Sequence, residues 1–161
     1  MEDYRSLDLS DKAWLWLAGG RVGEAQNEFA RQAERNPRAG APKAGYSLAV
    51  ALGGNMDRAV WAMRRAFRID PDSLRYLLIE ERLRPKLRRL VDEYSARVDS
   101  RDPAVDSAFM VAALRYIMHD DGGARSAIDR AIADGDLSQS SANLRRLVAV
   151  SSQRDGTTHE Y

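Results

Sequence analysis

Residues 43–72, KAGYSLAVALGGNMDRAVWAMRRAFRIDPD, decide the fold that we expect for this chain. Apolar residues recur at helical spacing on both sides of Gly53-Gly54, with Tyr46 and Val50 before the glycines and Met63 after them. Paired glycines between two such runs favour a turn. The stretch therefore predicts two amphipathic helices that fold back on each other, and it argues against strands.

The same pattern of residues occurs twice, 34 positions apart. The matched positions are Gly20, Ala25, Phe29 and Pro37 in the first copy and Gly54, Ala59, Met63 and Pro71 in the second. A period of 34 residues is typical of the tetratricopeptide repeat, a helix-turn-helix unit, and the order of residues in 43–72 resembles that family. The resemblance implies an all-α fold, a right-handed α-α superhelix of about four helical hairpins with a C-terminal capping helix.

The length of the chain, 161 residues, favours one domain. We predict a single helical domain over residues 1–151. Its parts are two repeats at about 6–39 and 40–73, a degenerate hairpin at 74–102, a fourth hairpin at 103–136 and a capping helix at 138–150. The polar tail, residues 152–161, is expected to be disordered.

The third hairpin lacks the alanines and the glycine turn of the repeat. Its first helix is expected to be capped by Ser73 and to contain an apolar group. That group is Leu74, Leu77, Leu78 and Ile79. Pro85 suits the first turn of the second helix, where the N–H that proline lacks is not needed.

The fourth hairpin returns to repeat spacing after a predicted break at Gly122-Gly123. Its small residues Ala113 and Ala124 are 11 positions apart, whereas Ser47 and Ala59 are 12 apart. The predicted turn of the fourth hairpin is therefore one residue short.

The resemblance also implies a binding role, because members of the family usually hold peptides or partner proteins on the concave surface formed by their first helices, without catalysis. Transferred to this sequence, that surface is an apolar groove for a partner's helix or extended segment. Its residues would be Trp14, Leu17, Ala41, Gly45, Leu48, Leu52, Met110 and Leu114. Alternatively these residues fill the core, or the face is covered by Tyr4 and Leu7, by the capping helix or by a second copy in a homodimer.

Composition excludes several function classes. The 25 basic and 24 acidic residues give a formal charge of +1, which does not call for nucleic acid or an anionic membrane. The chain has no cysteine, which removes disulfides, thiolate metal sites and cysteine nucleophiles. The N-terminus has no apolar run typical of a signal peptide, and no stretch reaches the ~20 apolar residues of a membrane span. A cytoplasmic location is the expectation.

Candidate catalytic and metal-binding groups are few. His119-Asp120-Asp121 brings three possible ligands together, but consecutive side chains seldom converge on one ion, so a polar turn is the preferred interpretation. The other histidine, His159, lies in the predicted tail. Gly19-Gly20 follows a predicted helix and lacks the spacing of a phosphate loop. We expect no enzyme activity and no cofactor, although an unrecognised helical enzyme or regulator stays open.

A basic segment offers an alternative binding surface for nucleic acid or an acidic partner. It consists of Arg82, Arg84, Lys86, Arg88 and Arg89. Carboxylates flank it on both sides, at Glu80-Glu81 and Asp92-Glu93, so a solvated helix face is the preferred interpretation. A protein or peptide is the expected partner.

Trp61 falls beside the predicted inward face of its helix. We expect it to pack on the degenerate hairpin rather than to form an exposed binding hot spot.

Overall fold

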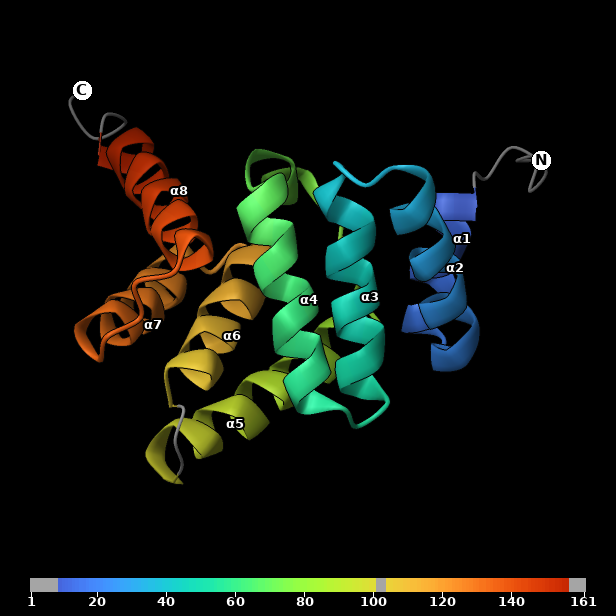
Figure 1. The fold of residues 1–161 in the computed structure, drawn as a ribbon, viewed down its shortest axis with the longest axis horizontal. Helices are drawn as coiled ribbons and strands as arrows, with labels where there is room; N and C mark the ends of the chain where they lie inside the picture. Colours follow the sequence, from blue (N-terminus) through green and yellow to red (C-terminus); the bar gives the residue numbers. More distant parts are fainter. Residues whose placement is uncertain (1–8, 101–103, 157–161) are drawn as a thin grey trace.

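The computed structural model describes residues 9–100 and 104–156, and these residues form helices and connections without a strand. The all-α class is therefore confirmed. The α-helices are α1 (Leu9–Ala18), α2 (Val22–Arg35), α3 (Gly40–Leu52), α4 (Met56–Ile69), α5 (Arg84–Ser100), α6 (Ala104–Ile117), α7 (Asp121–Ala133) and α8 (Gln139–Gly156), and η2 (Asp72–Tyr76) is a 3-10 helix. Figure 1 shows α1 and α2 at one end of the long axis, α3 and α4 in the middle, and α7 and α8 at the other end.

The turns that close the first two hairpins have the same backbone geometry, 34 residues apart. Gly20 and Gly54 both adopt a positive φ, +88° and +101°, a conformation that glycine reaches without a Cβ penalty. The hydrogen bonds around the two glycines match pair by pair. Arg21 N–H donates to Trp16 C=O and Gly20 N–H to Leu17 C=O, as Asn55 N–H donates to Val50 C=O and Gly54 N–H to Ala51 C=O.

The turn of the fourth hairpin lies at His119, not at Gly122-Gly123 as predicted. His119 has φ +65°, and Asp120 N–H donates back to Arg115 C=O, so His119 takes the position that glycine occupies in the first two turns. Gly122 and Gly123 lie inside the first turn of α7. The prediction was wrong because it assumed that only glycine marks this turn.

Placing the turn at His119 also corrects the predicted short loop. His119 precedes Ala124 by five positions, the same separation as Gly54 and Ala59. The small residue that matches Ser47 is then Ala112 rather than Ala113, and its distance to Ala124 is 12 positions, as in the second hairpin. Ala112 and Ala124 are both fully buried.

The helix predicted after Ser73 is reduced to η2, and residues 77–83 are not helical. Leu77 and Leu83 are buried while Leu78 is 89% exposed, so these leucines do not share one helix face. The segment links η2, whose Leu74 lies beside Gly40 at the start of α3, to α5, whose Lys86 reaches Ala18 at the end of α1. Residues 77–80 have no regular structure, and residues 81–83 form a turn in which Leu83 N–H donates to Glu80 C=O over 2.9 Å.

The C-terminal helix is longer than predicted. α8 runs from Gln139 to Gly156, so the first half of the predicted tail, residues 152–156, continues the helix, while the second half, residues 157–161, lies outside the described residues. α8 packs on α7 and on α4, which ties the C-terminal end to the second hairpin. Asn143 of α8 donates from its side-chain amide to Phe67 C=O of α4 over 2.9 Å. Within residues 9–100 and 104–156, no helix has the length and apolar character needed to cross a bilayer.

Candidate functional site

Most of the predicted groove residues lie in the core. Leu17, Leu48, Met110 and Leu114 have no exposed surface. The prediction that these four line an open groove is therefore wrong, because no partner can reach a side chain that the protein itself covers completely.

Trp14 and Gly45 pack against Phe29 of α2. The Trp14 and Phe29 rings meet edge to face with centroids 5.0 Å apart. A Cβ atom on Gly45 would lie 2.4 Å from a Phe29 ring carbon, so only glycine lets α3 approach α2 this closely. These two residues hold α1, α2 and α3 together and do not present a binding surface.

The face that carries Ala41 and Leu52 is partly covered by the protein's own chain, and a cavity of about 370 Å³ remains beside Leu52 between α3 and α5. Both residues are partly buried against the core. η2 and α5 contact α3, and Lys86 of α5 donates to Ala18 C=O at the end of α1 over 3.0 Å. The coverings that the sequence suggested were different: Tyr4 and Leu7 lie outside the described residues, and α8 packs at the other end of the molecule.

The basic segment does not form one surface. Lys86 and Arg84 use their charges on backbone carbonyls, of Ala18 at 3.0 Å and of Met118 at 3.3 Å, near the ends of α1 and α6, where cations are favourable. Arg82 pairs with Glu80 at 2.6 Å. Arg88 and Arg89 are exposed. The segment thus contributes mainly to the junction of α5 with α1 and α6.

We expect only weak, nonspecific attraction of this chain to DNA or RNA at physiological salt, since three of the five cations of the basic segment already have protein partners. A salt titration with a fluorescent oligonucleotide measures this directly. Tight binding at physiological salt that disappears in the triple variant Arg84→Ala, Arg88→Ala, Arg89→Ala would contradict the expectation.

The His119 to Asp121 cluster forms a turn and a helix cap. Asp120 accepts a hydrogen bond from Gly123 N–H over 3.0 Å, which is the normal role of an N-cap carboxylate. Within the described parts of the chain, no three histidine or acidic side chains converge as metal ligands.

A surface cavity lies between α2, α3 and α4. We call it the Trp61 pocket. Its volume is about 410 Å³. It is lined by Ala30, Ala33, Glu34, Pro37, Lys43, Tyr46, Arg58, Trp61, Ala62 and Arg65. Small apolar side chains and two aromatic rings are combined there with three cations and one carboxylate.

Trp61 is 54% exposed at this pocket, and the prediction that it packs on the third hairpin is wrong. The guanidinium of Arg65 lies 4.9 Å from the centroid of its ring, a cation–π contact that fixes the edge of the pocket. A large aromatic side chain that stays half exposed beside a cavity is typical of binding surfaces.

The exposed side of α4 carries a row of positively charged arginines. Arg58, Trp61, Arg65 and Arg68 follow a spacing of three, four and three residues, which places them on one helix face. None of these three arginines has a carboxylate within ion-pair distance among the described residues, in contrast to Arg64 on the other side of the same helix. This spacing was visible in the sequence but was not used in the prediction.

Lys43 lies at the base of the Trp61 pocket. Its ammonium donates to Pro37 C=O over 2.6 Å and to Ala39 C=O over 3.2 Å, which uses two of its three N–H donors. Burial lowers the pKa of Lys43, and the charge of Arg65 lowers it further, while Asp70 opposes the shift. An anion in the pocket would reverse part of this effect, because it stabilises the charged ammonium.

Arg58 is held in place by Tyr46. Its Nε donates to the Tyr46 hydroxyl over 2.8 Å, and its guanidinium lies 5.8 Å from the centroid of the same ring. The terminal nitrogens of Arg58 remain available for a ligand, and a fixed guanidinium binds a carboxylate with little loss of side-chain freedom.

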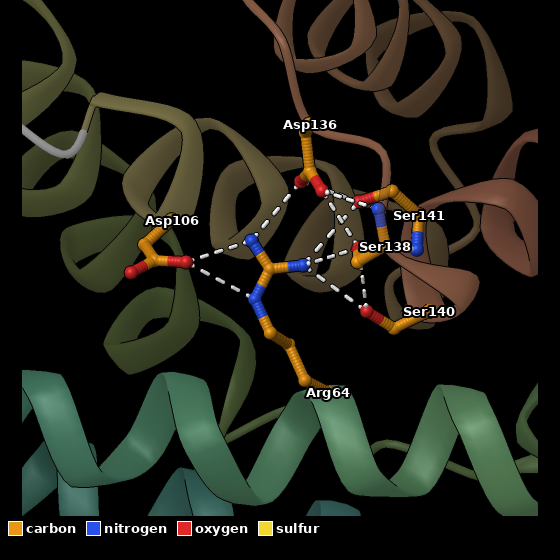
Figure 2. A network of polar contacts seen from close by, with 6 residues as sticks. All are labelled: Arg64, Asp106, Asp136, Ser138, Ser140 and Ser141. Carbon is orange, nitrogen blue, oxygen red and sulfur yellow. Dashed lines mark hydrogen bonds and ion pairs between the residues drawn. The ribbon is translucent and has the colours of Figure 1, made fainter.

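A second polar cluster, around Arg64, is internal (Figure 2). The Arg64 guanidinium donates to Asp106 over 2.7 Å, to Asp136 over 3.0 Å and to Ser138 over 2.9 Å, and it lies 4.3 Å from the Phe109 ring centroid. Ser140 and Ser141 complete the cluster. These bonds join α4 to the start of α6 and to the α7–α8 connection, so the cluster positions α8. Sequence spacing could not reveal it because its members are far apart in the chain.

The stability of the protein should depend on Asp136 at acidic pH. Desolvation raises the pKa of Asp136, but hydrogen bonds from Ser138, Ser141 and Arg64 outweigh it, so the pKa is lowered overall. The stabilisation is therefore present above the unfolded-state pKa of about 3.9 and is lost as the pH falls below it. Between about pH 6 and about pH 3, the urea concentration at the unfolding midpoint should fall further for the wild type than for Asp136→Asn. An equal fall in the two proteins would contradict this account.

Comparison of the chain with protein-family models, curated proteins and solved structures finds no match.

Proposed function

We propose that this chain is a non-catalytic, tetratricopeptide-like helical-repeat protein that binds a segment of a partner protein in the Trp61 pocket. The observation that carries the proposal is the half-exposed indole of Trp61 beside a cavity of about 410 Å³, where Arg58 and Arg65 have no described carboxylate within ion-pair distance. The 34-residue repeat pattern supports a binding role, and the Trp61 pocket is the surface that we propose for it.

The repeat character is supported by matching backbone geometry. The turns at Gly20 and Gly54 have the same hydrogen-bond pattern at a spacing of 34 residues, and the turn at His119 restores the same separations in the fourth hairpin. Stacked hairpins of this kind give extended surfaces made from several helices. The Trp61 pocket is such a surface, since α2, α3 and α4 all contribute to it.

The concave face is a weaker candidate for the same role. Leu48 is fully buried, and η2 and α5 cover α3, so a partner would have to displace part of the folded chain before binding there. The Trp61 pocket needs no such rearrangement.

The variant Trp61→Ala tests the proposal. Trp61 is half exposed, so its removal should change the free energy of unfolding by no more than about 0.5–1 kcal/mol, while partner binding is lost. The matched control is Leu137→Ala, which removes another large exposed side chain, 91% exposed, on the α7–α8 connection. Both variants and the wild type are used to capture proteins from cells that express the chain naturally.

A protein held by the wild type and by Leu137→Ala, but not by Trp61→Ala, is the expected result. If the three forms retain the same proteins, the pocket is not the binding surface.

A further inference from the structure

We infer that the Trp61 pocket, if it binds a partner as proposed above, takes an acidic peptide segment in which carboxylates flank an apolar side chain. The inference rests on the proposed function and adds the chemistry of the partner. It follows from the charges, the spacing and the apolar floor of the pocket.

The charges of the pocket call for an anionic partner. Lys43, Arg58 and Arg65 line it together with the single carboxylate of Glu34. Among the described residues, no carboxylate lies within ion-pair distance of Arg58 or Arg65, while many other arginines of the protein are paired. The paired arginines include Arg21, Arg31, Arg64, Arg82, Arg97, Arg130 and Arg145. A partner that supplies carboxylates would complete the two guanidinium groups with charge-assisted hydrogen bonds.

The spacing of the cations favours a chain over a single small anion. Arg58 and Arg65 are seven residues apart on α4, which separates them by about 10 Å along the helix axis. Trp61 lies between them in the sequence. Two carboxylates three residues apart in an extended peptide, or two turns apart in a helix, match this separation.

The middle of the pocket suits an apolar side chain. Ala30, Ala33 and Ala62 supply small apolar groups beside the rings of Trp61 and Tyr46. An apolar residue between the two acidic ones would bury its surface on these groups while the carboxylates stay at Arg58 and Arg65. The expected ligand is therefore an acidic–apolar–acidic segment.

Selection from a random peptide library displayed on phage tests the inference with the intact chain. We expect the enriched sequences to carry Asp or Glu on both sides of a Leu, Phe or Trp. The leading peptide is then synthesised together with a twin in which every Asp and Glu is replaced by Asn or Gln. Titration calorimetry at about 0.15 M salt measures the Kd of both peptides, since at that ionic strength distant charges are largely screened.

The expected weakening is about tenfold for Arg58→Ala, about tenfold for Arg65→Ala, and about a hundredfold for the double variant or for the amide twin, as for charge pairs that are partly desolvated. Arg89→Ala, an exposed arginine on α5, is the matched control and should leave the Kd unchanged. Thermal melts of each variant show that the fold is intact.

Each of the following results would overturn the inference. Enriched peptides that need Trp61 but carry no acidic residues would refute the acidic ligand and leave the proposed function standing. A twelve-residue thymidine oligonucleotide that binds through Arg58 and Arg65 as tightly as the best peptide would make nucleic acid the occupant. A wild-type dimer in sedimentation that Trp61→Ala dissociates would make a second copy the occupant. Peptides that bind independently of Trp61, or no enrichment at all, would refute the inference and the proposed pocket together.

Discussion

Arg64→Met is expected to lower the free energy of unfolding by about 3–5 kcal/mol, the cost of removing one partner from a buried charge pair. Asp136 is almost fully buried, and the Arg64 guanidinium is the only cation within ion-pair distance of it among the described residues. Methionine keeps an unbranched, flexible side chain at this position but leaves the carboxylate without its counter-charge. Urea unfolding followed by circular dichroism measures the loss.

The control for this variant is Arg68→Met, one turn further along α4. Arg68 is exposed and has no ion pair with a described carboxylate, so the same chemical change should stay within about 0.5 kcal/mol. A loss below about 1 kcal/mol for Arg64→Met would mean that the Arg64 cluster is solvated and does not hold α8 in place.

Leu48→Asp is expected to cost several kcal/mol, enough to unfold much of a domain whose total stability is typically about 5–15 kcal/mol. Leu48 has no exposed surface, so an aspartate at this position would be buried without a partner charge. An open groove would give the opposite result, because an exposed carboxylate there would be solvated and nearly neutral for stability.

Leu78→Asp is the matched control, because it makes the same substitution at a leucine that is 89% exposed on the segment between η2 and α5. We expect its melting temperature to stay close to that of the wild type. If Leu48→Asp melts like Leu78→Asp, the face of α3 that carries Leu48 is open after all.

Local patterns in the sequence predicted the helices well. The periodic stretches around Gly20 and Gly54 became two helical hairpins, because amphipathic spacing and glycine turns act over a few neighbouring residues. The α5 helix also begins where Pro85 indicated. The turn of the fourth hairpin was placed wrongly for a local reason, since His119 adopts a backbone conformation that is rare outside glycine.

The candidate site was not predicted, because its members meet only through tertiary packing. Pro37, Lys43 and Trp61 come from three parts of the second hairpin and the connection before it. The face of the first helices seemed open because the sequence did not show that η2 and α5 would pack against α3. The arginine spacing around Trp61 carried a readable signal, and the prediction did not use it.

The most direct test of the central claim is site-specific photo-crosslinking in cells that contain the natural partner. p-Benzoylphenylalanine replaces Trp61 in one form and Leu52, on the face partly covered by α5, in the other. The account predicts a crosslinked protein partner from position 61 and none from position 52. Crosslinking from position 52 alone would contradict the account and return the binding surface to the face of α1 and α3.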